Sequence, residues 1–262
     1  MTTISTRLAL PAVLFALATV CAAPAFAAED AESAKPETIL APASPEYRQF
    51  GVVYGESSEG WFRCSGTSVQ SPNESLVVTA GHCVHDEGHW AARKWVFIPG
   101  YRYGERPFGT FIAHWIGTTP GWLHHEDFNF DVGMAVVGRN ERGETLQQAV
   151  GGAHFASGLS PSQAFDVYGY PVAQPFTGAT LQRCSQAPFE GYDFEAFLNP
   201  GPLDLGVRCE VSGGSSGGGW VISGNRIDGV TSNTYPDDET TTYGPYFGGA
   251  VADLYARASG VR

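Results

Sequence analysis

The chain has 262 residues, of which 43% are apolar and 16% charged, so enough apolar surface is available for a core and a disordered protein is excluded. Lys and Arg number 15 against 27 Asp and Glu, and the net charge of -12 excludes nucleic acid as the expected partner, since phosphates are also negative. The 33 glycines and 17 prolines favour short strands joined by tight turns.

The N-terminal segment predicts export from the cell. Leu8–Ala23 is almost wholly apolar, and Ala25-Phe26-Ala27 provides the small residues that flank a cleavage site. We therefore expect a secretory signal peptide over residues 1–27. A membrane anchor is the alternative, but no basic stop-transfer cluster follows the apolar stretch. Residues 28–45 are rich in Ala, Glu, Ser and Pro and predict a pro-segment or flexible leader.

The remaining residues, 46–262, show short apolar runs separated by Gly, Pro, Asn and Asp, which predicts about six strands in each half. The expected strands of the first half are Gln49–Tyr54, Trp61–Val69, Ser75–Thr79, Trp95–Ile98, Phe108–Ile116 and Asp131–Val137. Those of the second half are Ala164–Tyr170, Gly178–Cys184, Gly206–Val211, Gly219–Ser223, Arg226–Ser232 and Tyr246–Ala250. Strands without intervening helices indicate an antiparallel all-β protein, either a sandwich or a barrel.

Two further segments complete this organisation. A polar, Gly-containing stretch over residues 139–152 predicts the connection between the halves, which span about 46–140 and about 150–262. Ala250–Ala258 alone has helical character and predicts a short C-terminal helix.

The cysteines of the mature chain indicate disulfides. Cys64, Cys83, Cys184 and Cys209 follow the signal peptide, and an even number in an exported chain predicts two bridges. Four cysteines allow three pairings. We expect Cys64–Cys83 and Cys184–Cys209, because nearest-neighbour pairing keeps one bridge in each half. A zinc site is the alternative, but no Cys-x-x-Cys spacing occurs.

Three segments carry side chains suited to nucleophilic catalysis. A β-branched run ends at two small residues and His82, which predicts an imidazole facing a cleft. Asp131 opens an apolar strand, where a carboxylate is costly unless it meets a donor such as an imidazole N–H, and Asp127 is its nearest rival. Ser212–Gly219 lies directly before an apolar strand and predicts a tight loop that presents a serine hydroxyl and backbone N–H groups. Taken singly, these features also fit a surface histidine, a strand-capping aspartate and a flexible linker.

Taken together, the three segments fit one mechanism. A serine hydroxyl is a weak nucleophile and needs an adjacent base. A histidine can supply that base, and a carboxylate fixes the imidazole tautomer and stabilises its charged form. The sequence offers one histidine, one aspartate and one serine, each beside a predicted strand.

The same segments resemble the active-site motifs of a known family. Thr79-Ala80-Gly81-His82-Cys83, Asp131-Val132-Gly133-Met134-Ala135 and Gly214-Ser215-Ser216-Gly217-Gly218 are similar, in this order, to the motifs of chymotrypsin-like (trypsin-like) serine peptidases. The secreted bacterial subgroup that includes glutamyl endopeptidases is the most similar. The resemblance spans roughly residues 49–258 and implies two antiparallel six-stranded β-barrels with the active site in the cleft between them.

The resemblance also implies a role for each residue. Ser216 would be the nucleophile, His82 the general base and then acid, and Asp131 the carboxylate that orients the imidazole. The backbone N–H groups of Gly214 and Ser216 would form the oxyanion hole. Ser215 is the rival nucleophile, and it stands where mammalian-type members place an aspartate for activation, so that activation switch is expected to be absent.

The specificity pocket is less well defined. Glu210 stands where an acidic residue in this family selects Arg or Lys before the scissile bond. The alternative is that Glu210 points outward and that Val211 and Thr231 form the pocket floor. Ser232, on the strand that resembles the substrate-pairing strand, is expected to touch the site. The absence of a histidine beside Thr231 argues against glutamyl specificity.

The expected function is therefore that of a secreted serine endopeptidase, extracellular or periplasmic, that acts as a monomer on peptides or proteins. It would need no cofactor or metal and would not bind nucleic acid, nor a membrane once the signal peptide is cleaved. A catalytically inactive binding protein on the same fold is the main alternative. A metal-dependent hydrolase that uses a histidine cluster around His82, with His85 and His89, is the other.

Overall fold

The computed structural model describes residues 35–39, 44–57, 60–91, 94–193 and 201–262. The predicted signal peptide lies outside these residues. No helix within the described ranges is long and apolar enough to cross a membrane. Most regular structure is strand, as the sequence predicts.

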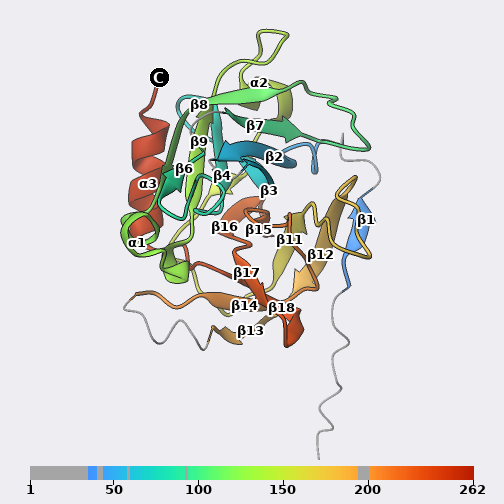
Figure 1. Ribbon diagram of the computed structural model, residues 1–262, viewed down its shortest axis with the longest axis vertical. Helices are drawn as coiled ribbons and strands as arrows, with labels where there is room; N and C mark the ends of the chain where they lie inside the picture. Colours follow the sequence, from blue (N-terminus) through green and yellow to red (C-terminus); the bar gives the residue numbers. More distant parts are fainter. Residues whose placement is uncertain (1–34, 40–43, 58–59, 92–93, 194–200) are drawn as a thin grey trace, which may run out of the picture. The chain divides into compact units, whose positions relative to one another are not determined.

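The first half forms a closed barrel in the strand order β2-β3-β4-β9-β8-β7 (Figure 1). Its strands are β2 (Phe50–Ser57), β3 (Gly60–Val69), β4 (Leu76–Thr79), β7 (Lys94–Pro99), β8 (Phe111–Thr118) and β9 (Gly133–Val137). All neighbouring strands pair antiparallel. The predicted six-stranded barrel is confirmed here.

The strand that leads to His82 is buried on both faces. Side chains of a strand alternate between its two faces. Val77 packs into the barrel interior, whereas Leu76 and Val78 pack in a second cluster that also holds Val251 and Leu254 of helix α3 (Gly249–Ser259). The continuous apolar run at the end of the first motif therefore has a partner on each side, and the strand end is held rigidly.

Short elements connect the barrel strands and complete the surroundings of the site. After His82 the chain forms a small hairpin of two short strands, and three short helices or helical turns follow. These elements are β5 (His85–Asp86), β6 (His89–Trp90), α1 (Pro120–His125), the 3₁₀ turn η1 (Phe128–Phe130) and α2 (Leu146–Val150).

The second half and the early strand β1 together form two hydrogen-bonded sheets, with the orders β1-β12-β11-β15-β16-β10 and β13-β14-β18-β17. The strands of these sheets are β1 (Glu37–Ile39), β10 (His154–Phe155), β11 (Phe165–Gly169), β12 (Leu181–Ala187), β13 (Phe189–Tyr192), β14 (Leu205–Arg208), β15 (Gly219–Ile222), β16 (Arg226–Val230), β17 (Asn233–Tyr235) and β18 (Asp238–Gly244).

Several details of this half differ from expectation. β10 pairs parallel with β16, so the strands are not all antiparallel. Glu37–Ile39, within the predicted leader, pairs antiparallel with β12, and the side chain of Ile39 is buried beside Leu181. The expected strand Tyr246–Ala250 is wrong, because helix α3 begins at Gly249.

Both predicted disulfides are present. Cys64–Cys83 links β3 to the residue after His82, with Cα atoms 6.2 Å apart, and Cys184–Cys209 lies in the second half, with Cα atoms 5.8 Å apart. The bridged residues are 19 and 25 positions apart in the sequence.

We expect the two bridges to differ in their effect on catalysis. Replacing either pair by alanine should lower the free energy of unfolding by about 3 kcal/mol, because each bridge closes a loop of similar length. Removing Cys64–Cys83 should also lower kcat, since Cys83 follows His82 directly. Denaturant unfolding and peptide hydrolysis of the two double variants measure this, and equal kcat values would contradict it.

Candidate active site

The turn that carries His82 is held from two sides by buried tryptophans. The indole N–H of Trp95 donates to the carbonyl of Cys83 at 2.9 Å, and that of Trp122 donates to the carbonyl of His85 at 2.7 Å. Gly81 must be a glycine, because a Cβ there would lie 2.7 Å from the Trp122 ring. The small residue of the motif thus lets the chain turn tightly against this ring.

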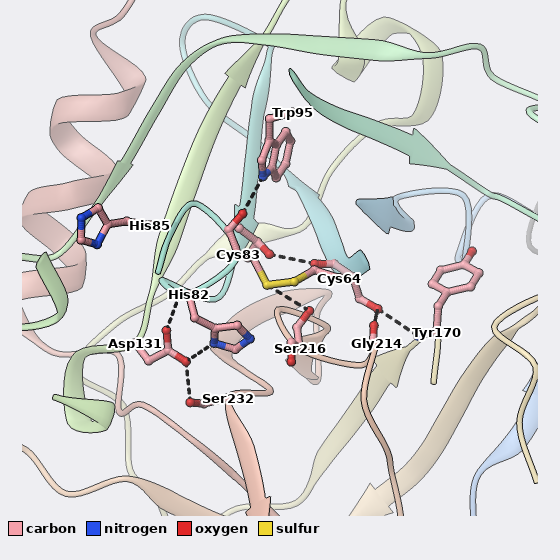
Figure 2. Close-up of a disulfide and its surroundings, with 12 residues drawn as sticks. Cys64, His82, Cys83, His85, Trp95, Asp131, Tyr170, Gly214, Ser216 and Ser232 are labelled. Atoms are coloured by element: carbon pink, nitrogen blue, oxygen red, sulfur yellow. Dashed lines mark hydrogen bonds and ion pairs between the residues drawn. A yellow bond between two sulfur atoms is a disulfide. The ribbon is translucent and has the colours of Figure 1, made fainter. Parts of the chain in front are cut away.

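Asp131 is fully buried, and three donors satisfy its carboxylate (Figure 2). The backbone N–H of His82 donates to Oδ1 at 2.7 Å, while the distance from His82 Nδ1 to Oδ2 is 2.8 Å. The hydroxyl of Ser232 donates to Oδ2 at 2.6 Å. Burial of a carboxylate is costly unless donors of this kind satisfy it, and the charge of Asp131 acts on the imidazole beside it.

The pKa of His82 is raised above the ordinary imidazole value. Burial lowers this pKa, but the charge of Asp131 and its hydrogen bond to the ring raise it more, and the charge of Asp86 adds to the rise. The His82 side chain remains 23% exposed, so it can still reach substrate. An imidazole of this kind is a stronger base than a free one.

The glycine-rich run is a packed loop and not a linker. A Cβ at Gly217 would collide with the side chain of Thr79, and one at Gly218 would collide with the carbonyl of Tyr168. Two backbone hydrogen bonds of 2.7 Å anchor the loop. The N–H of Ser65 donates to the carbonyl of Ser216, and the N–H of Gly217 donates to the carbonyl of Thr231.

Two backbone N–H groups of this loop have no acceptor among the described residues. Gly214 has a φ of 91°, which favours glycine, and its carbonyl accepts a 2.8 Å hydrogen bond from the hydroxyl of Ser65. Within the described part of the chain, the N–H groups of Gly214 and Ser216 donate to no protein acceptor. Both donors are therefore available to a ligand.

His82 and Ser216 line the same cavity, whose volume is about 300 Å³. Figure 2 shows the imidazole between Asp131, to which it is hydrogen-bonded, and Ser216. Ser215 differs, because its side chain is buried against Gly169 and its hydroxyl has no partner among the described residues.

A second cavity of about 310 Å³ lies beside the same loop, and Glu210, Val211 and Gly213 line it. Thr231 and Ser232 do not line this cavity; Thr231 Oγ1 accepts a hydrogen bond from the indole of Trp220 at 3.0 Å, and Ser232 bonds to Asp131. Sequence reasoning missed the other residues of the lining, which include Thr234, Tyr235, Pro236 and Glu239.

One group of possible metal ligands occurs among the described residues, namely Cys64, His82 and Cys83. The two cysteines are bonded to each other and offer no thiolate, so this donor set does not fit a metal ion. His85, which the metal alternative requires, is buried with its ring against Trp90 at a centroid distance of 4.9 Å.

Comparison with curated proteins gives one partial match in sequence. No protein-family model matches the chain. A stretch of 85 residues is 33% identical to an extracellular metalloprotease of Bacillus subtilis (strain 168), which covers 32% of this chain and 26% of that protein. The chain thus matches only about a quarter of the length of this relative.

Solved structures match over a much larger part of the chain. Protease Anisep from Arthrobacter nicotinovorans is 28% identical with a TM-score of 0.76, covering 82% of this chain and 96% of Anisep. The thermostable serine protease AL20 from an extremophilic microorganism is 34% identical with the same TM-score, covering 83% of this chain and 100% of AL20. A Glu endopeptidase with a TM-score of 0.68 and 18% identity shares the fold, over 86% of this chain and 97% of that one.

The all-β fold with its closed first barrel, its C-terminal helix and these neighbours is the two-barrel fold of the chymotrypsin-like proteases. The chain belongs to the chymotrypsin-like serine proteases.

Proposed function

We propose that the chain is a secreted serine endopeptidase in which Ser216 is the nucleophile, His82 the general base and acid, and Asp131 the orienting carboxylate. The observation that carries this proposal is the hydrogen-bonded chain from Ser232 through Asp131 to His82, together with a cavity lined by both His82 and Ser216.

The geometry supports a two-stage hydrolysis. Ser216 Oγ attacks the scissile carbonyl while His82 takes its proton, and the N–H groups of Gly214 and Ser216 stabilise the oxyanion. His82 then protonates the leaving amine, and an acyl ester remains on Ser216. Water then attacks the acyl ester while His82 takes a proton from the water. His82 returns this proton to Ser216 Oγ, and the carboxylic acid product is released. Asp131 stabilises the charged imidazole in both stages.

Export and domain organisation belong to the same proposal. A signal peptide over residues 1–27 would direct the chain out of the cell, and disulfides persist in that environment. Residues 28–45 would form the leader, and the two halves, about 46–140 and about 150–262, would build the peptidase domain. The enzyme would act as a monomer on peptides or proteins.

The lining of the second cavity favours substrates with a basic residue before the scissile bond. Glu210 and Glu239 both line it, so two carboxylates face the space where that side chain would bind. A cationic side chain pairs with such carboxylates, whereas an apolar one would leave them partly desolvated and unpaired.

We expect Glu210→Gln to remove most of a preference for arginine over leucine at this position. Matched peptides with Arg, Leu and Glu before the cut measure the preference through kcat/KM. One lost ion pair in a partly dry site corresponds to about a tenfold change. Glu190→Gln is the control, because Glu190 pairs with Arg208 outside the described lining of the cavity. Equal Arg and Leu cleavage in the parent enzyme would refute this role of Glu210.

Hydrolysis by the secreted protein tests the function itself. A peptide-library cleavage profile, run with and without a chelator, separates three outcomes. Chelator-resistant cleavage supports the serine endopeptidase. Chelator-sensitive cleavage supports a metal-dependent hydrolase, and binding without cleavage supports an inactive protein on the same fold.

A further inference from the structure

The cavity that holds His82 and Ser216 extends over residues that the proposed mechanism does not use. Trp61 of β3 and the β5–β6 hairpin residues Asp86 and His89 also line it. Its volume of about 300 Å³ lies at the lower end of the range for ligand pockets.

Trp61 has an unusually open position for a tryptophan. Its side chain is 62% exposed, although large aromatic side chains are mostly buried. Among the described residues, no ring stacks on Trp61 and no acceptor binds its indole. The next residue, Phe62, packs over Gly55 and is fixed there. Trp61 therefore offers a free aromatic face at the edge of the cavity.

Asp86 supplies a carboxylate to the lining of this cavity. Asp86 is exposed and pairs with no described cation, and its charge contributes to the raised pKa of His82. Arg63 also lines the cavity, but its guanidinium donates to the carbonyl of Gly178 and lies 5.4 Å from the ring centroids of Tyr54 and Tyr101. The guanidinium of Arg63 is thus held against residues that are outside the described lining of the cavity.

We propose that this cavity binds the part of the substrate that leaves first and that it selects a cationic side chain, arginine or lysine, in one of the first two residues after the scissile bond. The inference rests on the proposed function, because His82 must protonate the leaving amine and the leaving segment must lie beside it. Trp61 would stack on the cationic group and Asp86 would pair with it.

Acyl transfer tests this cavity separately from Glu210. A peptide ester acylates Ser216, and an added amine competes with water for the acyl-enzyme. The amine nitrogen bonds to the acyl carbon as the ester bond to Ser216 Oγ breaks, and the amine proton passes through His82 to Ser216 Oγ. The nucleophiles Arg-NH₂, Leu-NH₂ and Asp-NH₂, and their Gly-extended forms, probe the two positions with a constant acyl group.

We expect the ratio of aminolysis to hydrolysis to favour the arginine nucleophiles over the leucine nucleophiles by about tenfold, since a cation–π contact and one exposed ion pair act together. Added salt should reduce this preference. Asp86→Asn and Trp61→Ala should each lower it severalfold. Two exposed residues outside the described lining, Asp253 and Tyr103, provide the matched controls Asp253→Asn and Tyr103→Ala.

Each outcome has a defined meaning. Ester hydrolysis without an arginine preference, or a preference that survives in both Asp86→Asn and Trp61→Ala, overturns this inference alone. A preference for Asp-NH₂ overturns it as well, because it would show a cationic cavity. Absence of ester hydrolysis overturns the proposed function, and this inference with it.

Discussion

Replacing Ser216 with alanine is expected to lower kcat/KM for peptide hydrolysis by about four to six orders of magnitude. Without the hydroxyl, His82 and Asp131 have no nucleophile to activate, and only substrate binding and the oxyanion hole remain. Steady-state hydrolysis of the best peptide from the cleavage profile measures the effect, with active-site titration of the parent enzyme as reference.

Ser215→Ala is the matched control for this substitution. It removes the same group from the neighbouring residue, whose hydroxyl is buried and has no partner among the described residues. We expect this variant to retain substantial activity and normal stability. Full activity in Ser216→Ala would show that Ser216 is not the nucleophile. Loss of activity only in Ser215→Ala would show that Ser215 is the nucleophile instead.

Replacing Asp131 with asparagine is expected to lower kcat by about four orders of magnitude. The amide cannot stabilise the imidazolium and favours the wrong tautomer of His82. The pH profile should change as well. His82 acts as a base only when neutral, so kcat/KM falls as the pH drops through its pKa, which the Asp131 charge raises above the ordinary value of about 6.5. In Asp131→Asn, burial dominates and the acid limb should move to lower pH.

Two further variants make this prediction specific. Asp127 is also buried, but its carboxylate accepts from the N–H of Asn129, and an asparagine side chain can accept the same bond. Asp127→Asn should therefore keep both the rate and the acid limb. Ser232→Ala removes one donor from Asp131 and leaves the carboxylate, so a smaller loss is expected. An unchanged acid limb in Asp131→Asn would contradict the coupling between Asp131 and His82.

The first barrel could be predicted from the sequence, because each of its strands is an apolar or β-branched run bounded by turn residues. The second half could not be predicted as well. β18 begins with the acidic residues Asp238 and Glu239 and is not among the strands expected from the sequence, yet pairing with β14 and β17 makes it a strand. Conversely, Tyr246–Ala250 looked like a strand and has no strand partner. Both errors concern segments whose structure depends on distant partners.

The candidate site could likewise be predicted from the sequence only in part. Short motifs were sufficient to select His82, Asp131 and Ser216, since each lies within a local pattern of small residues or strand ends. The support around them comes from elsewhere in the chain. Trp95 and Trp122 hold the His82 turn through single hydrogen bonds to backbone carbonyls, and no local pattern marks an indole as such a donor. The same holds for Glu239, which reaches the Glu210 cavity from β18.

Labelling with a fluorophosphonate tests the central claim most directly. This reagent modifies a serine only where an adjacent base activates its hydroxyl. Mass spectrometry of the digested protein should find one modified residue, Ser216, in the parent enzyme and much less modification in Asp131→Asn. An unmodified Ser216 in the folded, disulfide-bonded protein, or a label on Ser215, would contradict the account.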